Sequence, residues 1–342
     1  DARRNTESSV LEIQRKSASL LDGISAQAFR KIGANDIASA VKNVPGVSVQ
    51  GGKYVYVRGL GDRYSKSILN GVDIPGLDPD RNTIQMDLFP TNLLSNVLVI
   101  KSARADLPAD FTGGVIDIIT KDFPSKEEIS ISISTSFNPD MHFNNSYLSY
   151  EGGRTDFLGF DDGTRKNKIF NSFLGNVFDP RLNNSVSGLN TINRVSNQFN
   201  PVMAPKNDIS GMNYNLAVNY GNQFNFENGH SFGYLGSLSY RREQTVYENS
   251  QDNIFNFSPD RSELNFEENR LQYGTIGGEN IILSGLFVTT YKTNNSKFRF
   301  NAIHIQNGES TSGSFRQLTR FSDFVDFNKF NLGRNIWNYL WN

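Results

Sequence analysis

The sequence has 342 residues, which is enough for one large or two ordinary domains. Its 34 Lys and Arg nearly balance its 35 Asp and Glu, so no excess of positive charge indicates nucleic acid as a partner. The chain has no cysteine and its three histidines lie far apart, which excludes thiolate chemistry and disulfides and leaves us expecting no metal site and no cofactor.

The N-terminal stretch DARRNTESSV lacks the apolar core of a signal peptide. No run of about 18 apolar residues occurs in the sequence, so we expect no transmembrane helix. Residues 1–20 are interpreted as a tether. We expect the sequence either to begin inside a longer protein or to follow a targeting signal that was removed.

The region up to about residue 125 predicts a small α+β domain. Apolar residues at i, i+3, i+4 and i+7 over 37–44 predict a short amphipathic helix. Asn35 or Asp36 is its predicted N-cap, and Pro45 is its predicted stop. Apolar runs at 47–49, 54–57, 93–100 and 115–119 supply the predicted strands.

The stretch KYVYVRGLGDRYSKSILNG at residues 53–71 raises the alternative of a nucleotide-binding loop. A dinucleotide fingerprint needs a third glycine where this chain has Tyr64, and it needs a helix where the chain returns to a turn. The spacing therefore excludes that reading. No nucleophile motif or catalytic cluster is recognisable elsewhere, so we expect no enzyme.

The region from 126 onward has a different chemistry. Residues 1–125 hold four Phe, three Tyr and no Trp, whereas residues 126–342 hold 22 Phe, 10 Tyr and 2 Trp. Apolar and polar residues alternate in EISISISTSF, NYNLAVNY and FGYLGSLSY, and strands are also expected near 281–291, from Phe298 and near Ile336. A period of two predicts strands with one apolar and one polar face.

The connections between these strands alternate between short and long. Turns near 227–229 and 293–296 are short, whereas about 138–210, 249–272 and 308–335 are long and polar. A compact soluble domain rarely carries a connection of some 70 residues, but outer-membrane barrels combine short turns with long loops. The pattern favours transmembrane barrel strands over a soluble β-rich binding or adhesion protein, which stays open as an alternative.

Taken in order, the motifs resemble a known family, the TonB-dependent outer-membrane receptors. NDIASAVKNVPGVSVQ, YVYVRG, ILNGVDIPG and LLSNVLVIKSARADLPADFTGGVIDIITK resemble successive pieces of the plug domain of these receptors. RGLGDRY and DPDRN resemble a narrower subgroup. The closing strand lacks the usual Glu and Arg-Gly-Pro, so ligands of better-known members do not transfer to this chain.

The resemblance implies an α+β plug domain followed by antiparallel transmembrane β-barrel strands. The tether then covers 1–20, the plug 21–124, and the N-terminal part of the barrel 125–342. Related receptors close with about 22 strands around the plug, so the barrel in this sequence is expected to be incomplete.

The same resemblance assigns roles to several residues. Arg58 is expected to lock the plug to acidic residues of the barrel wall, with a surface arginine beside a turn as the alternative. Tight turns inside the plug are expected at Gly59, Gly61, Asn70, Gly71, Gly113 and Gly114. A plug loop that faces the ligand is a further hypothesis, carried by Asp78, Asp80, Arg81 and Asn82, with a solvated turn as the alternative.

By resemblance, the protein is an importer of the Gram-negative outer membrane. An iron chelate, cobalamin, a glycan or a peptide would pass the plugged barrel, energised by TonB with ExbB and ExbD acting on an N-terminal segment. The lipid bilayer is an expected partner, and a surface lipoprotein or another outer-membrane protein is a candidate partner. A receptor-like barrel that serves as a structural subunit of a larger complex, without transport, is the alternative function.

Overall fold

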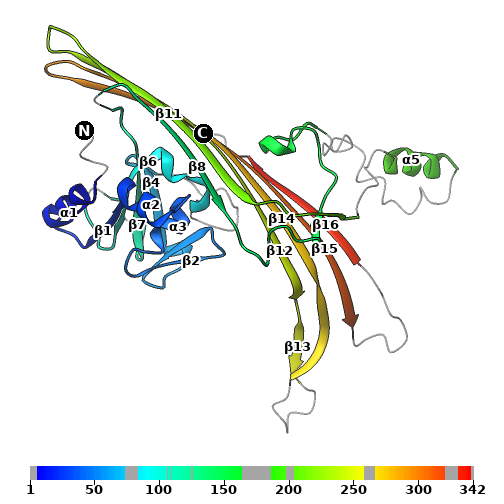
Figure 1. The fold of residues 1–342 in the computed structure, drawn as a ribbon. Coiled ribbons are helices and arrows are strands. Elements are labelled where there is room, and N and C mark those ends of the chain that lie inside the picture. The colour runs from blue at the N-terminus through cyan, green and yellow to red at the C-terminus, as the bar shows by residue number, and fades with distance from the viewer. Residues whose placement is uncertain are drawn as a thin grey trace.

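The computed structural model describes residues 6–73, 84–163, 186–197, 204–257, 266–319 and 330–339, apart from residues 106, 109 and 125. A compact N-terminal domain lies against one face of a long, twisted antiparallel sheet (Figure 1). We call this the inner face of the long sheet and the opposite side its outer face. Among the described residues, no helix is long and apolar enough to cross a membrane.

The N-terminal domain is built on a five-stranded sheet with the order β1-β6-β7-β4-β5, in which only β4 and β7 run parallel. A separate hairpin pairs β2 with β3. The strands are β1 (Leu21–Ser25), β2 (Val47–Gln50), β3 (Tyr54–Val57), β4 (Ser65–Leu69), β5 (Val72–Asp73), β6 (Leu94–Ile100) and β7 (Gly114–Thr120). The helices are α1 (Glu7–Lys16), α2 (Ala26–Ile32) and α3 (Ile37–Val41), with 3₁₀ turns η2 (Asp62–Tyr64), η3 (Met86–Leu88) and η4 (Thr91–Leu93).

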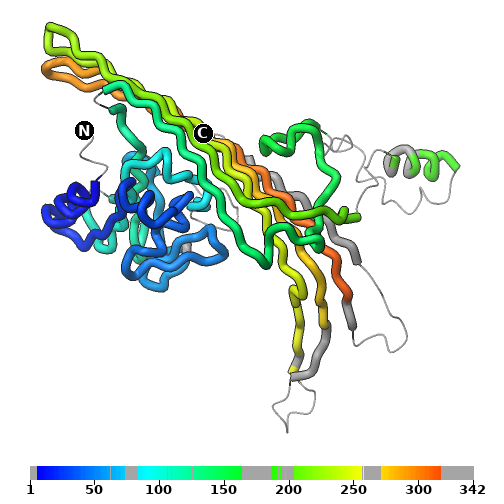
Figure 2. The backbone as a smooth tube through the Cα atoms, in the orientation of Figure 1, coloured from blue at the N-terminus to red at the C-terminus, as the bar shows by residue number. Residues whose placement is uncertain are grey.

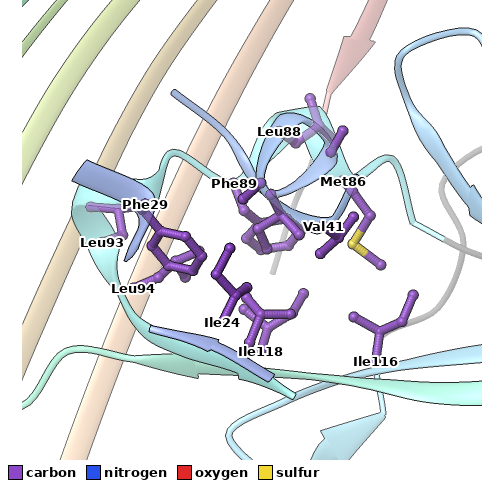
Figure 3. Close-up of a cluster of buried hydrophobic side chains, with 14 of the residues drawn as sticks. Ile24, Phe29, Val41, Met86, Leu88, Phe89, Leu93, Leu94, Ile116 and Ile118 are labelled. Carbon is purple, nitrogen blue, oxygen red and sulfur yellow. The ribbon is translucent and has the colours of Figure 1, made fainter. Parts of the chain in front are cut away.

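The predicted helix after residue 36 is α3, and its cap is formed by sequence-local contacts. The Asp36 carboxylate accepts the Ser39 amide at 2.7 Å, and the Ser39 hydroxyl returns to the Asp36 backbone, which completes a capping box. The apolar face of α3 packs into a core with Phe29 and Ile118, which point into one cluster in Figure 3. Cap and core together fix where Asp36 lies.

The long sheet has the strand order β16-β15-β14-β12-β11-β8, and each neighbouring pair is antiparallel. The strands are β8 (Glu128–Ser136), β11 (Asn213–Asn225), β12 (Ser231–Gln251), β14 (Phe266–Lys292), β15 (Lys297–Thr319) and β16 (Phe330–Tyr339), with β13 (Ile254–Phe257) paired to β14. The predicted fold class, a small α+β domain followed by antiparallel barrel strands, is confirmed.

The two faces of the long sheet differ in chemistry, as the alternation predicts. Apolar side chains stand exposed on the outer face, whereas serines, asparagines and an arginine alternate with apolar residues on the inner face. The exposed outer set includes Ile129, Ile131, Ile133, Leu216, Val218, Leu238, Phe287, Phe298 and Phe300. Such a band matches the lipid-facing surface of a membrane barrel.

Several elements extend beyond the boundaries expected from sequence. Helix α1 occupies part of the predicted tether and buries Val10 against the sheet. β15 continues to Thr319, well into the connection expected from 308, and β14 already begins at Phe266. Ladder hydrogen bonds come from the backbone, so pairing continues where the alternation of side chains fades. The boundaries at 20 and 124 stay predictions.

The connection between β8 and β11 contains β9 (Tyr147–Ser149), η5 (Asp156–Leu158), α5 (Val186–Ser196) and β10 (Lys206–Asp208). Figure 2 shows the described parts of this connection on the far side of the long sheet from the N-terminal domain. Its elements β9 and η5 pack on the outer face, where Tyr240 donates to the Phe157 carbonyl at 2.5 Å and Gln306 donates to the Gly159 carbonyl at 2.7 Å.

Candidate functional site: the interface between the two layers

The centre of the interface is Arg241 of β12, which is only 2% exposed. One guanidinium nitrogen of Arg241 donates to the Asp36 carboxylate, and the other donates to the Asp87 carbonyl at 2.8 Å. Its Nε lies 3.7 Å from a Glu243 carboxylate oxygen. Burying a guanidinium costs several kcal/mol unless charged and hydrogen-bonded partners replace its hydration. The two terminal nitrogens of Arg241 have such partners, whereas its Nε has the Glu243 charge nearby and no hydrogen bond.

Asp36 interacts with both the N-terminal domain and the long sheet. Its Oδ1 caps α3, while its Oδ2 faces Arg241 across the interface. The backbone of Asp36 also bridges Pro90, which fixes the start of α3 beside the segment that carries Asp87. The local capping geometry therefore aims a carboxylate at the long sheet.

Asp87 lies in η3, behind the same ion pair. Burial raises the pKa of Asp87 to about 6, although the positive charges of Lys53 and Arg241 act in the opposite direction. Lys53 continues outward and pairs with Glu309 of β15 at 2.7 Å, where both side chains are partly exposed. The ion pairs of the interface therefore range from the buried Arg241–Asp36 pair to the partly exposed Lys53–Glu309 pair.

Neutral contacts accompany these charges. Asn92 donates to the Ser237 hydroxyl at 3.1 Å, and the Ser134 hydroxyl lies 3.2 Å from the Asn35 side-chain oxygen. Between the polar contacts, apolar residues of the inner face join the core of the N-terminal domain. They are Leu235, Ile282, Leu286, Val288 and Ile305.

The segment between the two layers, residues 121–124, is seated on two glycines of the inner face. A Cβ at Gly233 would overlap the Phe123 ring, and one at Gly221 would lie 2.6 Å from Pro124 Cδ. The Lys121 amide donates to the Leu93 carbonyl at 2.9 Å. These glycines allow a backbone approach that any side chain would prevent.

Arg58, the predicted lock residue, lies at the end of β3 with an exposed side chain and a φ of +56°. Its amide donates to the Gly46 carbonyl at 2.8 Å, and no ion pair among the described residues includes it. Gly59 follows with a φ of +74°, and Gly61 approaches the Tyr56 ring. The lock role of Arg58 stays a prediction.

The other predicted turn residues lie either in a turn with positive φ or at a close approach of the backbone. Asn70 and Gly71 both have positive φ between β4 and β5, and Asn70 exchanges hydrogen bonds with Thr120 at 3.0 Å. A Cβ at Gly114 would lie 2.9 Å from Val57, and one at Gly113 would lie 3.0 Å from the Ser65 hydroxyl. The hypothetical ligand-facing residues Asp78, Asp80, Arg81 and Asn82 lie outside the described residues.

Sequence reasoning missed the barrel side of the interface. Arg241, Arg242 and Glu243 form a charged run directly after the neutral alternation of FGYLGSLSY, and that run is the available signal. On a strand, neighbours point to opposite faces, so one arginine had to face inward. In the structure, Arg241 pairs with Asp36 on the inner face, and Arg242 pairs with Glu279 on the outer face.

Comparison with known proteins gives the following matches. Residues 13–115 match the family model of the TonB-dependent Receptor Plug Domain. The siderophore receptor PirA from Pseudomonas aeruginosa is 14% identical, with a TM-score of 0.35 over 89% of this chain and 42% of that chain. The ferric citrate transporter FecA is 11% identical, with a TM-score of 0.34 over 96% of this chain and 52% of that chain.

A mutant of the ferric enterobactin receptor PfeA, also from Pseudomonas aeruginosa, is 11% identical, with a TM-score of 0.36 over 90% of this chain and 50% of that chain. The chain thus spans about half the length of these solved structures. No curated protein matches the sequence.

An α+β domain seated on the inner face of antiparallel barrel strands defines the class of plugged outer-membrane receptors. The match over residues 13–115 identifies the N-terminal domain as a TonB-dependent receptor plug domain. The resemblance to this family stated from sequence is therefore confirmed, whereas the narrower subgroup stays a prediction. The N-terminal domain is called the plug below, and the long sheet is called the barrel sheet.

Proposed function

We propose that the protein is an outer-membrane importer, in which TonB, with ExbB and ExbD, acts on a segment near the N-terminus and rearranges the plug. The ligand is an iron chelate, cobalamin, a glycan or a peptide. The loop that carries Asp78, Asp80, Arg81 and Asn82 remains our candidate for contact with that ligand. A lipid bilayer surrounds the barrel, and a surface lipoprotein or another outer-membrane protein is a further proposed partner.

The observation that carries the proposal is the chemistry of the interface between plug and barrel sheet. Its hydrogen bonds, such as Asn92 to Ser237, join small polar groups that water can satisfy equally well after separation. The Arg241–Asp36 ion pair holds the resting position in one geometry. A plug held in this way can move locally under force without exposing an entirely apolar core.

The test is a reversible lock between plug and barrel sheet. Asn92 and Ser237 are in hydrogen-bonding contact across the interface, and the 342 residues contain no cysteine. Asn92→Cys combined with Ser237→Cys therefore places one cysteine pair across the interface. Uptake by the full-length protein is measured in cells for an iron chelate, cobalamin, an oligosaccharide and a peptide.

We expect uptake of one of these ligands to stop when the disulfide forms and to return with a reductant. Each single-cysteine variant is expected to transport normally in both conditions. Uptake that continues with the disulfide formed, as shown by a non-reducing gel, would contradict an importer whose plug must move against β12.

A fixed structural subunit is the second candidate function, because five apolar residues of the barrel sheet merge with the core of the plug. Such a merged core resists separation. This function predicts no energised uptake of any ligand. It also predicts that the locked variant assembles with its outer-membrane partner as well as the unlocked protein does.

A further inference from the structure

A cavity lies at the end of the interface that is close to the short turns of the barrel sheet. Its volume is about 110 Å³, well above the roughly 10–15 Å³ that one water needs. Its wall is shared between Arg30 of α2, Lys121 after β7, and Arg299 of β15. Arg299 lies two residues after Lys297, which directly follows the turn at 293–296. The plug, the segment of residues 121–124 (called the linker below) and the barrel sheet each contribute one cation.

The acidic residues in the wall do not balance these cations. Asp122 also lines the cavity, and its carboxylate lies 3.8 Å from the ammonium group of Lys297, which is not part of the wall. Asp122 and Glu128 together carry two negative charges against the three positive charges of the wall. The cavity therefore carries a net positive charge in a partly enclosed place, which favours an anion.

Lys121 is the most confined of the three cations. Burial lowers the pKa of Lys121 to about 8, and the nearby charge of Arg30 acts in the same direction. Arg299 donates to the Lys121 carbonyl at 3.4 Å, so the linker backbone is held beside the guanidinium. A largely enclosed ammonium close to the Arg30 guanidinium costs free energy that the attraction of Glu128 does not fully offset, and an anion in the cavity would offset more of it.

We propose that this cavity is an anion site for a phosphate-class oxyanion, held by Arg30, Lys121 and Arg299. Two planar guanidinium groups suit the paired oxygens of such an ion, and the ammonium supplies a third charge-assisted hydrogen bond. The bound ion ties α2 of the plug to β15 of the barrel sheet at the point where the linker crosses. The site does not depend on transport, so it stands apart from the proposed function.

The test uses the full-length protein purified in detergent and inorganic phosphate as the probe. Calorimetric titration with sodium phosphate is compared with sodium chloride at equal ionic strength. We expect saturable heat with phosphate alone. Lys121→Met is expected to weaken binding by about tenfold or more, as for loss of a hydrogen bond to a charged group.

Lys126→Met is the matched control, because Lys126 is an exposed lysine five residues further along, outside the cavity wall. Its affinity for phosphate is expected to stay within about twofold of the unmodified protein. Arg299→Gln, at the exposed rim, is the second variant if Lys121→Met does not fold, and it should also weaken binding by about tenfold. Heat-modifiable gel migration reports whether each barrel is folded.

A second arm replaces inorganic phosphate with a short-chain phosphatidylglycerol below its micellar concentration. Binding of the lipid alone, lost with the same variants, supports the site and assigns its phosphate to a membrane headgroup. Heat that is equal in phosphate and chloride, with no lipid binding, overturns the proposal. Binding that survives unchanged in folded Lys121→Met and Arg299→Gln variants also overturns it.

Discussion

Arg241 on β12 and Asp36 at the start of α3 are 205 residues apart in the sequence, yet they form a buried ion pair between barrel sheet and plug. Because Asp36 also caps α3, the pair couples the fold of the plug to its position on the barrel sheet. Removing one partner leaves the other charge buried and uncompensated, which is more costly than the absence of both.

Arg241→Met is expected to lower the free energy of plug opening by about 3–5 kcal/mol, because Asp36 loses its buried counter-ion. Hydrogen exchange at the Ala40 amide, which donates to the Asp36 carbonyl at 3.1 Å, measures this opening in the full-length protein. Arg242→Met is the matched control, since Arg242 pairs with Glu279 on the outer face. Its effect on exchange at Ala40 should be small.

Asp36→Asn keeps a good helix cap while it removes the charge, so it separates the two roles of Asp36. In the Arg241→Met background this second change should cost less than it does alone, because no counter-ion remains to lose. Strict additivity of the two changes would mean that the ion pair does not couple plug and barrel sheet.

The stability of the plug should depend on the protonation of Asp87. The pKa of Asp87 is raised to about 6 in the folded protein from an ordinary value of 3.8, mainly by burial. The folded state therefore binds the proton more tightly, so the contribution of Asp87 to stability decreases as the pH rises from about 4 to about 6. Asp87→Asn should remove this decrease from the opening free energy measured by hydrogen exchange.

Asp110→Asn is a control of opposite sign. The pKa of the exposed Asp110 is lowered, first by its hydrogen bond from Lys66, so its contribution is present above the ordinary pKa and is lost as the pH falls. If Asp87→Asn leaves the pH profile between about 4 and 6 unchanged, the burial of an Asp87 carboxylate in the plug is contradicted.

The Lys53–Glu309 pair should contribute much less than the buried pair. Both side chains are about one-quarter exposed, at 26% and 28%, so water and salt screen their attraction. Lys53→Met is expected to change the opening free energy by about 1 kcal/mol or less, and the change should vanish in about 1 M salt. An effect as large as that of Arg241→Met, measured in the same exchange experiment, would contradict this ranking.

The sequence was sufficient for the class of fold because its signals are local. Alternation in EISISISTSF predicts β8, and the cap at Asp36 predicts α3, since both follow from the periodicity of one element. The partner of Asp36 could not be found in this way. It depends on the register between β12 and its neighbours and on how the plug sits, which no single element encodes.

Arg58, a residue of the plug, shows the same limit of prediction from a single element. Its position at the end of an apolar strand made it the natural choice for a lock, but the strand ends in a positive-φ turn that leaves the side chain exposed. Arg241, which faces the plug from mid-strand, had no motif to mark it. The charge that holds this part of the interface thus comes from the barrel sheet, and the plug supplies the carboxylate.

The linker should need a glycine at position 233 in order to pack against β12. Gly233→Ala adds a Cβ that would overlap the Phe123 ring, and overpacking of this kind costs about 1–3 kcal/mol. Gly236→Ala, on the same strand, is the matched control, because its Cβ would meet only the Tyr220 carbonyl oxygen at 3.9 Å. Hydrogen exchange at the Lys121 amide should become faster in the first variant and stay unchanged in the second.

Phe123→Leu in the Gly233→Ala background should restore part of the protection, because the smaller side chain makes room for the added methyl group. A gain of protection would show that Phe123 and Gly233 contact each other in the full-length protein. No gain, with equal exchange at Lys121 in the two glycine variants, would mean that the linker does not rest on β12. The contact between the linker and β12 would then have no part in positioning the plug.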